Sequence, residues 1–303
     1  MRLGTSIDTD QLIDDVVTSV RAAKDAGFST VWSSQIFGAD ALTVFAVVAR
    51  EVAGIGFGTG VIPVHPRHPQ VLAQQALTVQ AISDGRLTLG IGLSHQVVVE
   101  GMWGYSFDTP ATYMREYLDA LVPMLHGEVA TVHGERVHAV TIGPVGPKGG
   151  SAPKLVIAAL GPVMLKLAAT AADGTVTWMT GLATLRDYIV PTITKAAGAA
   201  GRPAPSVIAS LPVCCTSDVA AATERINTAL AIYPTLPSYK AMLDREGAES
   251  AADVALVGSK DRIVDGIGQL ATAGVTDFTA AVMGNDDERA ATNDVLSEVA
   301  KRT

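Results

Sequence analysis

The chain has 303 residues, of which 48% are hydrophobic and 17% are charged, so it can bury a large core and is not a disordered segment. The net charge of −8, without a run of Lys or Arg, argues against a nucleic-acid-binding protein. The adjacent Cys214 and Cys215 cannot build a long-range disulfide framework, which indicates a reducing compartment. The N-terminus reaches Asp8 too soon for a signal peptide, and no apolar run approaches the roughly 20 residues of a membrane helix. We therefore expect a soluble cytoplasmic protein that does not bind membranes.

One junction recurs along the chain: an amphipathic helical pattern ends at a glycine, and a short β-rich run follows. In the first example, apolar residues from Leu12 to Ala23 recur at helical spacing, and Asp8 or Thr9 is expected to cap the helix. Such alternation predicts parallel strands joined by crossover helices. The four junctions are Asp25-Ala26-Gly27, Ser83-Asp84-Gly85, Ala172-Asp173-Gly174 and Thr272-Ala273-Gly274.

Eight strands in about 300 residues predict an α/β fold with one closed (β/α)8 TIM barrel over residues 1–303. The alternative fold, an open doubly wound sheet, is expected to carry a Gly-x-Gly-x-x-Gly turn. The glycines from Gly54 to Gly60 do not have that spacing, because residue 59 is Thr. Residues 126–142 are expected to insert an exposed hairpin, and residues 232–256 to cover one barrel end. The predicted strands are Arg2–Ile7, Thr30–Ser34, Gly54–Val64, Leu87–Leu93, Leu155–Leu160, Thr175–Thr180, Val207–Cys215 and Asp277–Met283.

In a barrel of this kind the active site lies at the carboxyl ends of the strands, which directs attention to two backbone features. Glycine at every even position from 54 to 60 leaves one face of the third strand bare, either for tight packing or for a flat ligand. The run Leu160-Gly161-Pro162-Val163-Met164 opens a helix with free N–H groups, which is either an anion site or an ordinary turn. A metal at His65 and His68 is disfavoured because no carboxylate or Cys stands beside them.

Several motifs together resemble the bacterial luciferase-like monooxygenase superfamily, and most closely its coenzyme F420-dependent oxidoreductase branch. Each motif is weak alone, but their order and spacing match from the first strand to the last. They are Thr59-Gly60-Val61-Ile62-Pro63, Arg67-His68-Pro69, Ala73-Gln74-Gln75-Ala76, Asp84-Gly85-Arg86-Leu87-Thr88-Leu89-Gly90-Ile91-Gly92, Ser94-His95, Glu100-Gly101-Met102-Trp103-Gly104, Arg115-Glu116-Tyr117-Leu118 and Ala159-Leu160-Gly161-Pro162.

The resemblance implies a (β/α)8 barrel that binds the deazaflavin F420, with FMN as the alternative cofactor, and commonly assembles as a homodimer. It implies a non-prolyl cis peptide between Gly60 and Val61, behind the ring system. Arg67 and Lys166 are the candidates to meet the acidic tail of the coenzyme. The implied phosphate contacts are Leu160, Gly161, Val163 and Met164, and the implied ring contacts are Gln35, Leu93 and Ser94.

This sequence departs from the branch in its acid/base residues. Sugar-phosphate and alcohol dehydrogenases of the branch carry an Asp-His pair after strand two and a Glu after strand four, where this chain has Gln35-Ile36 and Ser94-His95. His95 is then the remaining proton-transfer candidate, unless it only donates a hydrogen bond to the cofactor. Three functions stay open: an F420-dependent oxidoreductase that transfers a hydride at C5 to or from a small organic substrate, an FMN-dependent monooxygenase, and a non-catalytic deazaflavin-binding relative.

The substrate cannot be read from the sequence, but its pocket can be located. Residues 96–110 and 232–256 are expected to form the wall, with an apolar lid of Met102, Trp103, Tyr105 and Phe107. The alternative interpretation is that these four side chains do not form a lid and are simply buried under the barrel end.

Overall fold

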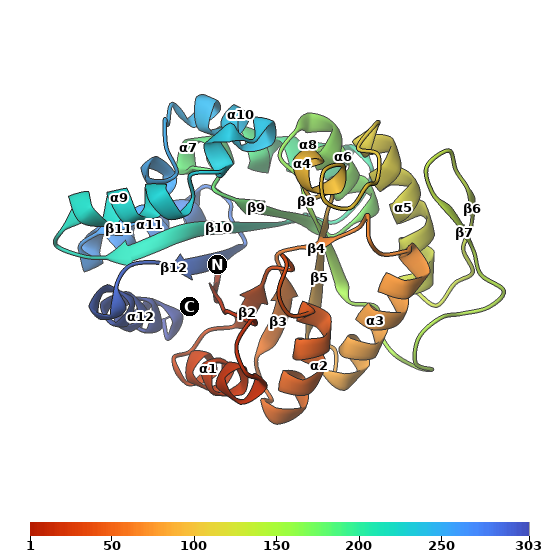
Figure 1. Ribbon diagram of the computed structural model, residues 1–303, viewed down its shortest axis with the longest axis horizontal. Helices are drawn as coiled ribbons and strands as arrows, with labels where there is room; N and C mark the ends of the chain where they lie inside the picture. The colour runs from red at the N-terminus through yellow and green to blue at the C-terminus, as the bar shows by residue number, and fades with distance from the viewer. Residues whose placement is uncertain (303) are drawn as a thin grey trace.

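Eight parallel strands close into a barrel in the computed structural model, which describes residues 1–302 (Figure 1). Each strand pairs in parallel with the next, and β12 returns to pair with β1, Leu3 opposite Phe278. The predicted (β/α)8 barrel is confirmed. The barrel strands are β1 (Arg2–Ser6), β2 (Thr30–Ser33), β3 (Gly56–Thr59), β5 (Leu87–Gly92), β8 (Lys154–Ala158), β9 (Gly174–Trp178), β10 (Ser206–Cys215) and β12 (Asp277–Val282).

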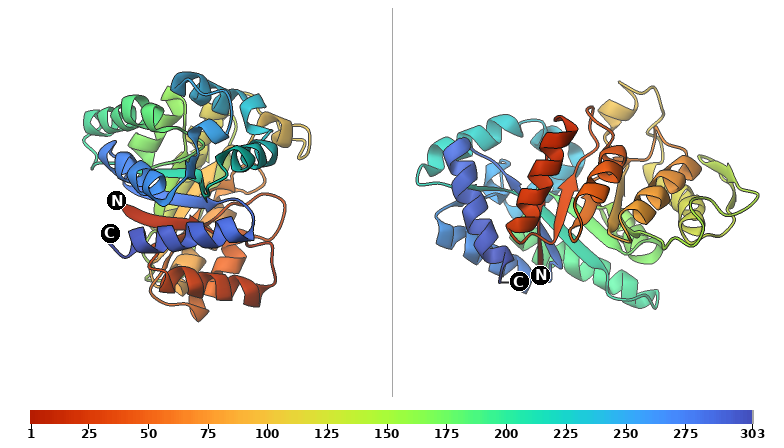
Figure 2. Two further views of the ribbon diagram at one scale, coloured as in Figure 1. Left: turned by 90° about the vertical axis from the view of Figure 1, so that its left-hand side faces the viewer. Right: turned by 90° about the horizontal axis from the view of Figure 1, so that it is seen from below.

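Helices surround the barrel, and most bury their apolar stripes against its outer face in one continuous core, whereas Ala222 and Ile226 belong to a second, smaller cluster (Figures 1 and 2). None of the helices within residues 1–302 is both long and apolar enough to cross a membrane. The main helices are α1 (Ile13–Asp25), α2 (Ala41–Glu51), α3 (Pro69–Ile82), α5 (Pro110–Leu125), α6 (Pro162–Ala171), α8 (Val190–Ala199), α9 (Val219–Ala229), α11 (Lys260–Thr272) and α12 (Asp286–Ala300).

The start of α1 differs from the prediction. The helix begins at Ile13, and Leu12 at its N-cap is 78% exposed and makes no capping bond. Asp8 accepts a hydrogen bond from the amide of Asp10 instead, and the buried Thr9 hydroxyl lies 2.8 Å from that of Ser33. Both expected caps are therefore used by the loop that follows β1, which ties that loop to β2.

Three of the four junction glycines have the positive φ of a helix-stopping glycine, whereas Gly174, with φ +154°, is the first residue of β9. Gly27 has φ +94° and Gly85 has φ +80°, conformations that a side chain would strain. The repeated junction was therefore a reliable sign of the helix-to-strand connections.

The predicted third strand, 54–64, is two strands. β3 ends at Thr59, the Gly60–Val61 peptide bond is cis as the resemblance implied, and β4 (Ile62–Pro63) resumes the pairing with β5. The Thr59 hydroxyl takes the place of the backbone hydrogen bonds that are interrupted between β3 and β5. It donates to the Gly90 carbonyl and accepts from the Gly90 amide, both at 2.8 Å.

The bare face of β3 is filled by the barrel's own Trp32. A Cβ on Gly58 would lie 2.4 Å from the Trp32 ring, so this position requires glycine for packing. At Gly60 the nearest atom would be 3.7 Å away, which leaves room on the side of the cis bond. Trp32 packs inside the barrel with Val156, Val176 and Ile208.

Two segments of the chain lie outside the eight barrel strands. The first is the hairpin of β6 (Thr131–His133) and β7 (His138–Val140), which projects from the body beside α5 (Figures 1 and 2). The second contains η2 (Tyr233–Thr235), α10 (Pro237–Glu246), η3 (Ala252–Val254) and β11 (Leu256–Gly258), a strand that we did not predict and that pairs with β10. Three short helical segments complete the fold: α4 (Gln96–Val99), α7 (Leu182–Thr184) and η1 (Leu185–Ile189).

Candidate active site

The carboxyl ends of β2, β3, β5 and β8 meet at one mouth of the barrel. The Ser34 hydroxyl donates to the Gly60 carbonyl at 2.7 Å, and the Gln35 amide donates to the Val61 carbonyl at 3.4 Å. A Cβ on Gly92 would lie 2.7 Å from Val61 and 3.3 Å from Ala158 of β8. The predicted site segments thus share one end of the barrel, with Leu93 and Ser94 following Gly92, and Leu160 and Gly161 following β8.

Gln35 has a second role at this mouth. Its Oε1 accepts a hydrogen bond from the Ala41 amide at 2.8 Å, at the start of α2. The side-chain amide is therefore held in place by the helix that follows β2.

The start of α6 presents free backbone donors. Gly161 is the N-cap with φ −81° and ψ 160°, Pro162 occupies the first turn, and no side chain among the described residues caps this end. A Cβ on Gly161 would meet no heavy atom within 4 Å, and Val163 is 59% exposed. The N–H groups at Val163 and Met164, with the helix dipole behind them, are donors to which an anion such as a phosphate can bind.

His95 stands at the same mouth, after β5. Ser94 before it has φ +61°, and the His95 carbonyl accepts from the amides of Val98 and Val99 at 2.9 Å, which starts α4. The imidazole ring lies 5.7 Å from the ring of Tyr239. Burial lowers the pKa of His95 below its ordinary value of 6.5, which favours the neutral form of the ring.

An aromatic row that the sequence analysis missed continues from His95 across the mouth. Tyr239 meets Tyr233 edge-on at 4.9 Å between ring centroids, and Tyr233 meets Trp178 at 6.0 Å. Burial raises the pKa of both tyrosines, so their hydroxyls stay protonated. The row links the end of β5 to the end of β9 through residues more than 130 positions from His95 in sequence, and no local motif marks them.

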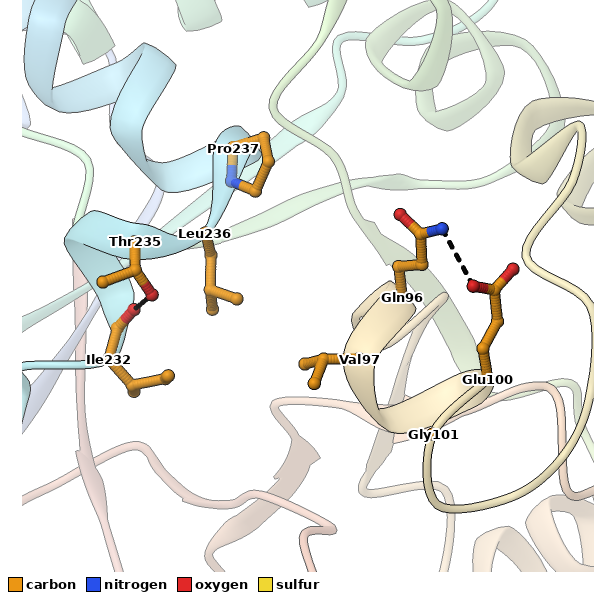
Figure 3. A pocket seen from close by; sticks show the side chains of 8 residues that line it. All are labelled: Gln96, Val97, Glu100, Gly101, Ile232, Thr235, Leu236 and Pro237. Atoms are coloured by element: carbon orange, nitrogen blue, oxygen red, sulfur yellow. Dashed lines mark hydrogen bonds between the residues drawn. The ribbon is translucent and has the colours of Figure 1, made fainter.

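A cleft of about 700 Å³ adjoins this row, between α4 and the η2–α10 segment (Figure 3). The two segments predicted to form one wall do line one cavity. The predicted lid of Met102, Trp103, Tyr105 and Phe107 does not line it: Met102 is 62% exposed, and Phe107 packs against His65 at 5.8 Å. The lining residues are Gln96, Val97, Glu100, Gly101, Ile232, Thr235, Leu236 and Pro237.

The histidines of the third βα loop have structural partners. The buried His65 ring stacks on Tyr113 with centroids 4.4 Å apart. His68 caps α3 through the Gln70 amide, and its Nε2 lies 2.9 Å from the His138 carbonyl of the hairpin. Within residues 1–302 no three His, Cys, Asp or Glu side chains gather as a metal site.

The two candidate partners of an acidic coenzyme tail differ. Arg67 is paired with Asp40, the N-cap of α2, and is mostly shielded from solvent. Lys166 lines an open groove of about 580 Å³ between α6 and α8, together with Lys195. Of the two, Lys166 is the side chain available to an external anion.

Known proteins are similar to this chain in sequence and in fold. The model of the luciferase-like monooxygenase family matches residues 1–277. A Mycobacterium tuberculosis protein named as a coenzyme F420-dependent oxidoreductase is 28% identical over 284 residues, which cover 88% of this chain and 80% of the relative. Coenzyme F420-dependent tetrahydromethanopterin reductase from Methanopyrus kandleri has a similar structure, with a TM-score of 0.82, 22% identity and coverage of 98% and 97% of the two chains.

An FMN-bound structure shares the fold as well. The oxygenating constituent of 3,6-diketocamphane monooxygenase from Pseudomonas putida, in complex with FMN, superposes with a TM-score of 0.78 at 19% identity over 99% of this chain and 97% of its own. These two structures are too distant in sequence to show more than the barrel. The family model, in contrast, spans most of the sequence, and the chain belongs to the luciferase-like monooxygenase family.

Proposed function

We propose that this protein, an oxidoreductase of the luciferase-like class, uses coenzyme F420 to transfer a hydride to or from a small organic substrate. The observation that carries the proposal is the uncapped N-terminus of α6 at the same barrel mouth as Gly60–Val61 and His95. The name of the 28%-identical relative favours F420.

The residues at the mouth fit a deazaflavin with a phosphate-bearing side chain. The amides of Val163 and Met164 would hold the phosphate, because they are donors without a capping side chain. Gly60, where a Cβ would meet only the Trp32 ring, and the segment Leu93–Ser94 would flank the ring system, and Lys166 would face its acidic tail. When bound, the deazaflavin supplies hydride transfer at C5, while the protein supplies orientation and the proton.

His95 is proposed to handle that proton. Reduction of a C=O, C=C or C=N bond by a hydride must be matched by one proton, and a half-buried imidazole beside the cleft can exchange it. Burial lowers the pKa of His95, which favours the neutral ring. The neutral imidazole can accept the proton released in substrate oxidation, and the imidazolium can donate the proton needed for reduction.

The alternative cofactor is FMN, which the FMN-bound structural neighbour supports. Titration of the purified protein with F420 and with FMN, followed by the fluorescence of each cofactor, separates the two. We expect tighter binding of F420, and a preference for FMN would refute the cofactor assignment. Turnover of reduced F420 with a panel of enones, imines and ketones, and of oxidised F420 with alcohols, then separates an enzyme from a non-catalytic binding protein.

Assembly and location follow as expectations. We propose a homodimer, as the family resemblance implies, in which a second copy would cover Val47 on α2 and Val71 on the neighbouring α3, each 46% exposed. We also propose a cytoplasmic location, where the unpaired Cys214 and Cys215 remain reduced.

A further inference from the structure

The cleft between α4 and the η2–α10 segment exposes apolar side chains that face each other. Val97 is 59% exposed and Ile232 is 57% exposed, and Figure 3 shows them on opposite sides of the cleft with Leu236 beside Ile232. An apolar group bound between them would remove both side chains from water, which stabilises the complex in proportion to the area buried.

The charge in the cleft lining is of one sign, and it is negative. Glu100 is the single charged residue in the lining that the described residues provide. Gln96 Nε2 donates to its Oε2 at 2.9 Å and the Phe107 amide donates to its Oε1 at 3.1 Å, which fixes the carboxylate at the cleft wall. The nearby Lys240 is paired with Asp244 at 2.7 Å. An anionic ligand would therefore meet a carboxylate without a free lining cation to offset it.

The cleft lies beside the proposed reaction site. Gln96 follows His95 directly, and Tyr239, whose ring contacts His95, lies two residues after Pro237 of the cleft lining. A substrate with its reacting carbon beside His95 would thus extend its other end between Val97 and Ile232.

We infer that this cleft binds the non-reacting end of the substrate, and that this end is apolar and carries no negative charge. The substrate class is then a ketone, enone, imine or alcohol with a hydrocarbon body, rather than a phosphorylated or carboxylated compound. The assignment of this group to a substrate rests on the proposed function, whereas its chemistry rests on the cleft alone.

A matched pair of fluorescent probes tests the chemistry of the cleft. N-phenyl-1-naphthylamine is neutral, and 1-anilinonaphthalene-8-sulfonate has the same ring system with an added sulfonate. We expect the neutral probe to bind at least tenfold more tightly to the wild-type protein. Glu100→Gln should reduce the difference in affinity between the two probes by strengthening the binding of the sulfonate, because the substitution removes the charge and keeps the size of the side chain.

Variants locate the probe. Val97→Asp and Ile232→Asp place a charge on either wall at exposed positions, and each should weaken binding of the neutral probe at least tenfold. Val129→Asp is the matched control, since this valine is 51% exposed and lines no part of the cleft. Equal or tighter binding of the sulfonate, or equal losses in Val97→Asp and Val129→Asp, would overturn the inference.

A parallel titration with F420 separates this inference from the proposed function. Val97→Asp should bind F420 as the wild-type protein does. A loss of F420 binding in that variant would assign the cleft to the cofactor and overturn the inference. If the wild-type protein binds the neutral probe in the cleft but does not bind F420, the proposed function fails while the chemistry of the cleft stands.

Discussion

Replacement of Gly161 by aspartate tests the proposed phosphate site without a change in the fold. The backbone at Gly161 has φ −81° and ψ 160°, which any residue adopts, and the space for a Cβ is open. Aspartate and glycine differ as N-caps by only a few tenths of a kcal/mol, in favour of aspartate. We therefore expect Gly161→Asp to keep or slightly raise the Tm.

The same substitution should weaken F420 binding strongly. The new carboxylate would accept the N–H groups assigned to the phosphate and would stand about 4 Å from it, where like charges repel by about 1 kcal/mol in water and about 4 kcal/mol at a protein surface. This range corresponds to about a 5- to 900-fold loss of affinity. We expect the Kd from a fluorescence titration at low salt to rise at least tenfold, and the loss to shrink as salt screens the repulsion.

Two controls separate charge from other effects. Gly161→Asn has the same size and also caps the helix, but it lacks the charge, so it should lose less affinity than Gly161→Asp. Gly143→Asp adds a charge at another open glycine, away from α6, and should leave the Kd unchanged. An unaltered Kd in Gly161→Asp, or an equal loss in Gly143→Asp, would refute the phosphate assignment.

Four further predictions address the remaining residues. His95→Gln should keep the F420 affinity and lower turnover about a hundredfold or more, and unchanged turnover would exclude His95 as the proton-transfer residue. In the wild-type enzyme, kcat/KM for substrate reduction should fall as pH rises through a pKa below 6.5, kcat/KM for oxidation should rise through the same pKa, and both limbs should vanish in His95→Gln. Thr59→Val leaves the buried amide and carbonyl of Gly90 without partners, at a cost of about 1–3 kcal/mol each, so Tm should drop by several °C, whereas the exposed Thr78→Val should change it little. Light scattering at micromolar concentration should give the mass of a dimer, and a monomer mass would reject the proposed assembly.

The barrel was predictable because its signals are local. A helical stripe, a glycine such as Gly27 or Gly85 with positive φ, and a β-rich run are all contained in about 25 consecutive residues. The start of α6 was predictable for the same reason, because Gly161 followed by Pro162 specifies an uncapped helix end.

Other features depend on contacts between distant residues. The sequence left two roles open for the glycines of β3, and only the position of Trp32 decides that Gly58 serves packing. The capping role expected of Asp8 or Thr9 failed because Thr9 pairs with Ser33, 24 residues away. The aromatic row was missed because Tyr239 contacts His95, and Tyr233 contacts Tyr239, only once the barrel has closed.

The barrel mouth has two parts, which differ in how freely their residues can be substituted. The proposed cofactor side consists largely of backbone groups at Gly60, Val61 and the start of α6, so few side-chain substitutions can alter it without a change in the fold. The cleft side consists of side chains on α4 and on residues 232–239, which lie on excursions outside the barrel strands and are partly exposed. Substitution at Val97 or Ile232 therefore costs little stability, while it changes the surface that a ligand meets. We expect the choice of substrate to be separable from cofactor binding in this protein, because the two depend on different elements that share only the barrel end and His95.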